Sequence, residues 1–325
     1  MKKHFKKLLL MALMAVMAVG LIACGTDKSD NESTKEEKTS VTITSLNSSK
    51  NEIELEVPYN PKRIAILDLS SLDIIDKLGV GDRVVGMAST SIDYLEKYSN
   101  DSSIKNLGTI KEADLEAVME CEPDIIFIGG RLSNSYDALS EIAPVVYLAT
   151  DTNEGLVNSV SKNAKTIASI FGMEDKVNSL MSDFGARIDA IKKISSGKTA
   201  LVGMTTSGSF NLLGNDGRCS LIGVEAGFNN LTVAGSTSTH GNESSFETVV
   251  QQNPDYIFVM DRDSAISTAG AKTAKEIVEN ELVKTTDAYK NNHIIYLEHS
   301  NVWYTAEGGI QALDIMLTDL EKGLK

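Results

Sequence analysis

Two stretches of the sequence follow one pattern, and both end on arginine. Residues 114–131 read DLEAVMECEPDIIFIGGR, and residues 245–262 read SFETVVQQNPDYIFVMDR. Aligned without a gap, they share a Glu, a Val, Pro-Asp, Ile-Phe and the terminal Arg131 or Arg262. A guanidinium group never loses its charge and offers planar hydrogen-bond donors, so such a pair is suited to an anion with several oxygens.

Arginine is used sparingly in this chain, which contains six arginines and 25 lysines. A duplicated unit that keeps its arginine therefore suggests a ligand site shared by two equivalent halves. The alternative interpretation is a pair of surface arginines that happen to follow strands.

Each repeat has the pattern of a helix followed by a Pro-Asp turn and a buried strand. Residues 112–121 have helical apolar spacing, Pro123 ends that helix, and residues 124–130 form a largely apolar run typical of a parallel sheet. Similar short runs alternate with helical patterns elsewhere, at residues 62–68, 82–88, 144–149, 199–204 and 293–298. This alternation predicts Rossmann-like sheets, whose ligands bind beyond the carboxyl ends of the strands.

The alternation is interrupted once, between residues 152 and 195. This segment contains no proline and keeps apolar residues three and four positions apart, which predicts one long connecting helix, bent at Gly172. We therefore expect an N-terminal lobe at 41–151 and a C-terminal lobe at 196–325. Further helices are expected near 219–227, near 271–283 and from about 307.

The first residues have the pattern of an export signal. Lysines precede an uncharged apolar run that is too short for a membrane span, so residues 1–23 read as a signal peptide. The run ends in Leu-Ile-Ala-Cys, which resembles the lipobox of bacterial lipoproteins and implies acylation of Cys24; an ordinary secretory signal is the alternative. Residues 24–40 are polar and predict a disordered tether. We expect an extracytoplasmic protein anchored to the membrane by lipid, and the long tether favours a Gram-positive cell.

The charge of the chain limits its partners. Loss of the four lysines in residues 1–23 changes the formal net charge from −14 to −18. So acidic a protein is a poor candidate for binding nucleic acid or lying flat on anionic lipid. Cys121 and Cys219 fall in different predicted lobes, so we expect buried free thiols rather than a disulfide.

An exported lipoprotein with two such lobes and one connecting helix resembles the class III substrate-binding proteins of ABC importers. The resemblance covers nearly the whole chain, and the family carries ferric siderophores, haem and cobalamin. The segments IIFIGGR, NDGR, STHGNESSFE, NPDYIFVMDR and NVWYTAEGG are similar to its catecholate-siderophore branch. The resemblance implies an α/β fold of two Rossmann-like lobes joined by a single long α-helix. It also implies a monomeric receptor, not an enzyme, with no intrinsic cofactor, which delivers its ligand to a permease dimer.

The resemblance implies that three arginines, Arg131, Arg218 and Arg262, surround the catecholates. A ferric catecholate is strongly anionic, and its charge is spread over planar oxygens that guanidinium groups match. In so acidic a protein the attraction must be local, because the long-range field repels the ligand. A salt bridge between Arg218 and Asp216 is the alternative role for that arginine.

The resemblance also implies that His240 and Tyr304 complete the iron coordination when a siderophore fills only four positions. Imidazole and phenolate are both iron ligands in proteins. Taken alone, His240 could be a solvated loop residue and Tyr304 a packed aromatic. Trp303 either stacks on the ligand or packs in the core, and we favour packing. His293 and His299 adjoin a predicted strand and are interpreted as structural, so a carrier of bare metal is not expected.

Both repeats carry a glutamate at the same position of the helix, Glu116 and Glu247. In the family, a Glu on each lobe meets arginines of the permease, and these two match that role. Exposed helical glutamates are common, so it is their matched positions in the two repeats that support the docking role.

Two other functions remain open at this point. A haem- or cobalamin-binding protein of the same fold could use Tyr304 or His240 as an axial ligand, although three arginines exceed what two propionates need. A cell-surface enzyme would need metal-binding carboxylates at strand ends. Asp261 and Asp263, on either side of Arg262, are the nearest candidates, and no nucleophile elbow accompanies the Ser and His residues of the 235–244 loop.

Overall fold

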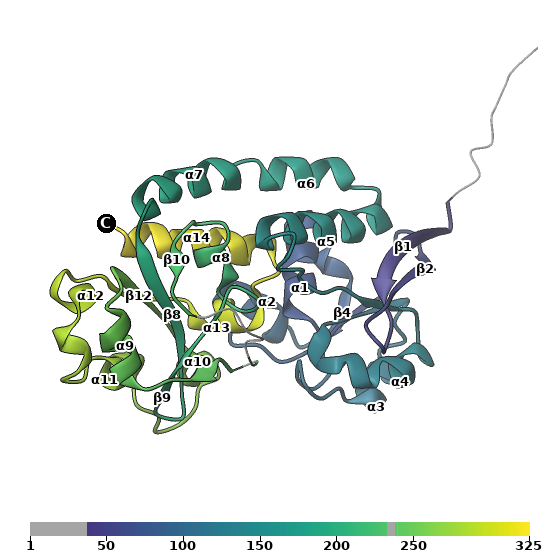
Figure 1. Cartoon of the computed structure of the whole chain (residues 1–325). Coiled ribbons are helices and arrows are strands. Elements are labelled where there is room, and N and C mark those ends of the chain that lie inside the picture. Colours follow the sequence, from purple (N-terminus) through teal and green to yellow (C-terminus); the bar gives the residue numbers. More distant parts are fainter. Residues whose placement is uncertain (1–37, 233–237, 239) are drawn as a thin grey trace, which may run out of the picture. The chain divides into compact units, whose positions relative to one another are not determined.

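Residues 38–232, 238 and 240–325 are described by the computed structural model. The predicted signal peptide, Cys24 and most of the tether lie outside the described residues. From Lys38 onward the described residues form two β-sheets, each surrounded by helices, and a separate two-stranded hairpin (Figure 1).

The first lobe contains a five-stranded sheet in which every strand pair is parallel. In spatial order the strands are β5 (Lys105–Asn106), β4 (Val84–Met87), β3 (Ile64–Ile66), β6 (Ile125–Ile128) and β7 (Val145–Tyr147). The helices are α1 (Leu69–Leu78), α2 (Glu96–Ser99), α3 (Leu115–Glu120) and α4 (Tyr136–Ser140). Every residue of β3, β6 and β7 is buried, as the uninterrupted apolar runs predict for strands covered on both faces.

The second lobe contains a six-stranded sheet that is mixed, whereas the sequence pattern predicted a parallel one. Its main path runs through β11 (Asn242–Glu243), β9 (Ser209–Leu212), β8 (Thr199–Thr206), β12 (Tyr256–Asp261) and β13 (Ile294–Tyr296), and β10 (Asn229–Asn230) pairs with β8. β9 runs antiparallel to β8 because Ser207 and Gly208 both adopt positive φ, 51° and 83°, and make a two-residue hairpin turn.

The helices of the second lobe are mostly short. They are α8 (Ser220–Gly223), α9 (Phe246–Gln252), α10 (Arg262–Ala265), α11 (Ala274–Val278), α12 (Asp287–Lys290), α13 (Ser300–Thr305) and α14 (Ile310–Gly323). The helix expected near 219–227 is thus reduced to one turn. The last predicted helix is α14, and α13 before it was not predicted.

The connecting segment is helical, but it forms three consecutive helices rather than one. These are α5 (Leu156–Phe171), α6 (Glu174–Met181) and α7 (Phe184–Ser195). Gly172 ends α5 in a left-handed conformation, so the chain reverses there and α6 packs back against α5. A second interruption follows Met181, where the Ser182 hydroxyl binds the carbonyl of Ser179. In Figure 1, α6 and α7 follow one another above both lobes.

A hairpin at the start of the predicted N-terminal lobe was not predicted. Its strands are β1 (Ser40–Leu46) and β2 (Glu52–Pro58), and β1 packs against α5 and β7. The predicted tether, 24–40, therefore ends where β1 begins.

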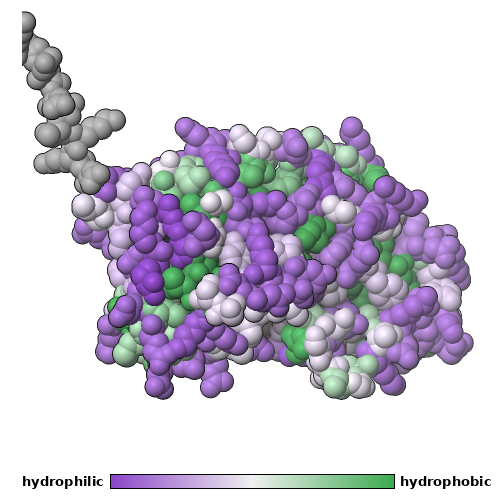
Figure 2. All heavy atoms as spheres, turned by 180° about the vertical axis from the view of Figure 1, so that it is seen from behind, coloured by the Kyte–Doolittle hydropathy of each residue, from purple (hydrophilic) through white to green (hydrophobic). Residues whose placement is uncertain are grey.

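The described residues bury a continuous apolar core that includes residues of both lobes. Cys121 and Cys219 are both free and buried, which confirms the prediction for them. Among the described residues there is no helix of sufficient length and apolarity to cross a membrane. On the face drawn in Figure 2, apolar residues lie scattered among polar ones. Two α/β lobes joined by a helical segment are the fold class that the sequence predicts.

Candidate ligand-binding site

Tyr304 lies among three arginines that come from both lobes. Arg131 follows β6 of the first lobe, while Arg218 precedes α8 and Arg262 begins α10 in the second. Their ζ carbons lie 5.4, 4.5 and 5.7 Å from the centroid of the Tyr304 ring. The two arginines that end the sequence repeats are thus brought to one side chain, with Arg218 beside them.

The three guanidinium groups donate hydrogen bonds to two oxygens of Tyr304, its backbone carbonyl and its phenol oxygen. Arg131 Nη2 donates to the Tyr304 carbonyl at 3.0 Å, and Arg218 Nε approaches the same carbonyl at 3.5 Å. Arg262 Nε donates to the phenol oxygen at 3.2 Å, and its Nη1 donates to Thr206 Oγ1 and Asp263 Oδ1. The phenol oxygen therefore sits in a positively charged environment.

The pKa values of the site reflect this concentration of positive charge. Burial alone would raise the pKa of Tyr304, but the hydrogen bond from Arg262 and the charges of all three arginines outweigh it and lower that pKa. Burial, followed by repulsion from Arg218, lowers the pKa of Arg131. An anion that enters here relieves the repulsion among the cations, so the site favours anionic ligands.

Two cavities flank Tyr304 and Thr305 between the lobes. One has a volume of about 450 Å³ and is lined by the loops that follow β3, β6 and β7, together with Arg131 and Arg218. The other has a volume of about 390 Å³ and is lined by residues 89–91 and 109–111 of the first lobe and 265–267 of the second. Together they form a cleft at the carboxyl ends of the strands, where open α/β sheets bind ligands.

Two carboxylates near the arginines were not predicted from the sequence. Asp68 and Glu307 both line the larger cavity. Burial raises the pKa of each, and Arg131 partly opposes this shift at both. Asp68 is the residue at the carboxyl end of the first predicted strand, and that position could have identified it.

His240 is exposed, and the arginine cluster acts on it. The pKa of its imidazole is lowered by partial burial and then by the charges of Arg262, Arg218, Lys111 and Arg131. A neutral imidazole is the form that can bind a metal ion. Its backbone carbonyl accepts a hydrogen bond of 2.8 Å from Asn211 Nδ2.

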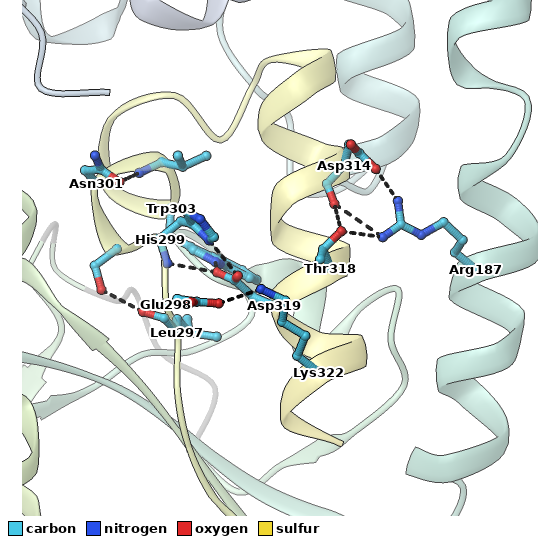
Figure 3. Close-up of polar contacts among 12 residues, drawn as sticks. Arg187, Leu297, Glu298, His299, Asn301, Trp303, Asp314, Thr318, Asp319 and Lys322 are labelled. Carbon is cyan, nitrogen blue, oxygen red and sulfur yellow. Dashed lines mark hydrogen bonds and ion pairs between the residues drawn. The ribbon is translucent and has the colours of Figure 1, made fainter. Parts of the chain in front are cut away.

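Trp303 and His299 are held by one buried carboxylate, as Figure 3 shows. The Trp303 side chain is fully buried, and its Nε1 donates to Asp319 Oδ2 at 3.0 Å. His299 Nδ1 lies 2.7 Å from Asp319 Oδ1, and its backbone N–H donates to Oδ2 at 3.0 Å. The prediction that Trp303 packs in the core is confirmed.

Among the described residues, one group of potential metal ligands stands apart from the cleft, formed by Glu298, His299 and Asp319. Asp319 already accepts hydrogen bonds from Trp303 and His299, and Glu298 forms an ion pair with Lys322 at 2.8 Å. His293 stacks on Tyr256 with ring centroids 4.2 Å apart. The two histidines interpreted as structural therefore make structural contacts.

Glu116 and Glu247 occupy equivalent positions in the two lobes. Each is an exposed residue in the first turn of its helix, α3 or α9, after the capping residue Asp114 or Ser245. Both side chains are therefore accessible at the surface of their lobes.

The fold and the cleft define the class of the protein. Residues 64–300 match the family described as Periplasmic binding protein, so the chain belongs to that family, which consists of substrate-binding proteins.

Individual relatives are similar over nearly their full length. The petrobactin-binding protein YclQ of Bacillus subtilis (strain 168) is 35% identical over 98% of this chain and 99% of its own. Its crystal structure has a TM-score of 0.79, covering 88% of this chain and 99% of that one. The ferric-anguibactin-binding protein FatB of Vibrio anguillarum is 27% identical over 82% of this chain and 84% of its own. The catecholate-siderophore binding protein VctP of Vibrio cholerae is 30% identical, with a TM-score of 0.78 over 87% of this chain and 100% of that structure.

Proposed function

We propose that this protein binds a ferric catecholate siderophore in the cleft between its lobes and delivers it to an ABC permease. The observation that carries the proposal is the position of Tyr304 among Arg131, Arg218 and Arg262, which come from both lobes. The relatives support the ligand class, because their names specify petrobactin, ferric anguibactin and catecholate siderophores. Iron(III) enters as part of the cargo, and the protein needs no cofactor of its own.

In this proposal the three guanidinium groups meet the catecholate oxygens. Arg131 and Arg218 now donate to the Tyr304 carbonyl, and Arg262 donates to the phenol oxygen. A catecholate carries more charge than either of these acceptors, so each arginine gains a stronger, charge-assisted partner when the ligand enters.

His240 and Tyr304 are proposed to bind iron when the siderophore supplies four oxygens. The lowered pKa of Tyr304 makes its phenolate easier to form, and the lowered pKa of His240 keeps its imidazole neutral. Both shifts favour the protonation states that a metal ligand requires. A hexadentate tris-catecholate would leave neither residue a coordination position.

Delivery to the membrane uses features outside the cleft. We propose that Glu116 and Glu247 dock onto arginines of the permease dimer, one lobe on each half. Cys24 is proposed to carry the lipid anchor that holds a monomeric, non-enzymatic receptor at the outer face of a Gram-positive membrane, with residues 1–23 as the signal and 24–40 as the tether.

A spectroscopic comparison tests the ligand class. The protein from about residue 38 onward is mixed with a ferric bis-catecholate in one sample and with haem in another. We expect saturable binding of the catecholate with its broad visible absorption, and only weak binding of haem. Tight haem binding with a sharp Soret band, and no catecholate binding, would favour the haem alternative.

A further inference from the structure

Asp73 joins the two lobes at a buried contact. It belongs to α1 of the first lobe, and its side chain accepts the backbone N–H groups of Gln311 and Ala312, both at 2.9 Å. These two groups lie in the first turn of α14 in the second lobe. Tyr94 Oη also donates to Asp73, at 2.6 Å.

Asp73 serves α14 as an N-terminal cap supplied by the other lobe. The first N–H groups of a helix have no partner within it, and usually the residue before the helix accepts one. Here that residue is Gly309, which has no side chain to do so. The carboxyl group of Asp73, 0% exposed, fills this role, because each of its two oxygens accepts one of these N–H groups.

The loop between α13 and α14 fits closely against the first lobe. A Cβ atom added at Gly309 would lie 2.4 Å from Asp73 Cγ, and one added at Gly308 would lie 3.0 Å from Ser70 Oγ. Both glycines follow Tyr304 by only a few residues. The contact therefore sets how near this loop lies to α1.

The position of α14 is passed on to α13, which carries Tyr304. Asp319 of α14 accepts the Trp303 indole N–H and two groups of His299, as Figure 3 shows. Asn301 Nδ2 adds a bond of 2.8 Å to the carbonyl of Ser91 in the first lobe. Because these hydrogen bonds hold α13 against α14, a shift of α14 relative to α1 would also move Tyr304 relative to the first lobe.

Arg131 belongs to the same lobe as Asp73 and contacts Tyr304 from the other side of the cleft. We propose that Asp73 is a positioning residue for the ligand site, because its contact with α14 fixes Tyr304 against Arg131. Asp73 itself does not touch the ligand. This inference rests on the proposed function for its ligand and on the contacts above for its mechanism.

The chain provides a matched control in the same helix. Asp76 also belongs to α1 and also accepts a hydrogen bond from a tyrosine hydroxyl, that of Tyr98, at 2.6 Å. In this pair, however, both Asp76 and Tyr98 lie in the first lobe. We therefore compare Asp73→Asn with Asp76→Asn. Gly309→Ala is a second test variant, because its methyl group displaces the loop while Asp73 remains; its φ of −91° suits alanine.

Two readouts are measured on protein shown to be folded by circular dichroism. The first needs no ligand: acrylamide quenching of Trp303, the single tryptophan, reports how well α13 is packed. The second is the affinity for a ferric bis-catecholate and the Tyr304-dependent part of its visible band. We expect Asp73→Asn and Gly309→Ala to increase the quenching and to weaken binding roughly tenfold or more, about the value of one charge-assisted hydrogen bond. Asp76→Asn should leave both readouts at the wild-type level.

The proposal would be overturned if Asp73→Asn and Gly309→Ala showed the same quenching and affinity as the wild type. It would also be overturned if Asp76→Asn lost as much affinity, with as large an increase in quenching, as the two test variants. If the wild-type protein does not bind the catecholate, the proposed function fails. The quenching comparison still decides in that case whether Asp73 positions α13.

Discussion

Arg131 in the first lobe donates a hydrogen bond of 3.0 Å to the backbone carbonyl of Tyr304 in the second lobe. The residues are 173 positions apart, and their contact crosses the cleft between the lobes. An anion bound at this point touches both lobes at once, so affinity depends on how the lobes are held as well as on the residues that line the cleft.

Each cleft arginine should contribute separately to affinity. Replacing Arg131, Arg218 or Arg262 by Gln removes a charge-assisted contact, which costs roughly 1.5–3 kcal/mol and so weakens binding about tenfold to a hundredfold. Calorimetric titration with a ferric catecholate measures the loss. Lys193→Gln, an exposed residue of α7, makes the same charge change away from the cleft and should bind like the wild type. Unchanged affinity in all three arginine variants would exclude the proposed role of the cluster.

If His240 binds iron directly, the loss of affinity in His240→Ala should depend on how many coordination positions the siderophore fills. His240→Ala should weaken binding of a four-coordinate ferric bis-catecholate more than that of a six-coordinate tris-catecholate, because only the former leaves coordination positions open. The ratio of the two affinities is the measurement, and the tris-catecholate is the internal control. Equal losses for both ligands would indicate that His240 acts without binding the metal.

The stability of the protein should depend on the ionisation of Asp73. Burial, only partly opposed by hydrogen bonds from Tyr94 and from backbone groups of α14, raises the pKa of Asp73 from 3.8 to about 6. Because the folded state binds this proton more tightly than the unfolded state, the contribution is complete below about pH 4 and is lost as the pH rises through 6. The free energy of unfolding should fall by up to about 3 kcal/mol over this interval from Asp73 alone.

Urea denaturation between pH 4 and pH 7.5 measures this dependence. Asp68 and Glu307 also have raised pKa values and contribute with the same sign, so part of the slope remains in any single variant. Asp73→Asn should flatten the curve, since an amide does not titrate. An identical slope in wild type and variant would show that Asp73 does not ionise in this range.

The docking glutamates should affect uptake without affecting ligand binding. Glu116→Gln and Glu247→Gln should each reduce iron uptake by cells that depend on this receptor, and the double variant should reduce it further, because each lobe would lose its proposed charge pair with the permease. Glu174→Gln, which changes an exposed glutamate in the first turn of α6, is the control. Normal uptake by the double variant would contradict the docking role.

The features that could be predicted from the sequence are those that depend on local sequence patterns. The repeat placed Arg131 and Arg262 after equivalent strands of the two lobes, and open α/β sheets bind ligands beyond the carboxyl ends of such strands. Gly172 was predicted to bend one long helix, because glycine readily takes a left-handed conformation; the structure instead ends α5 there and reverses the chain. Arg218 carries no such signal, and only the resemblance of its NDGR segment to a known family indicated it.

The parts that could not be predicted depend on contacts between distant residues. Asp73 looks like an ordinary polar residue of an amphipathic helix, because the groups that it caps lie 238 and 239 positions away. The antiparallel strand β9 was missed because its turn, Ser207-Gly208, is a weak hairpin signal. The second break in the connecting segment follows Met181, where neither proline nor glycine marks it.

The most direct test of the account is a titration of the wild-type protein and Tyr304→Phe with a ferric bis-catecholate. Quenching of Trp303 reports binding, and the visible charge-transfer band reports the iron coordination. We predict tight binding by the wild type with a shift of the band, and loss of that shift in Tyr304→Phe. Absence of binding by the wild type would contradict the proposed function, and an identical band shift in both proteins would contradict iron binding by Tyr304.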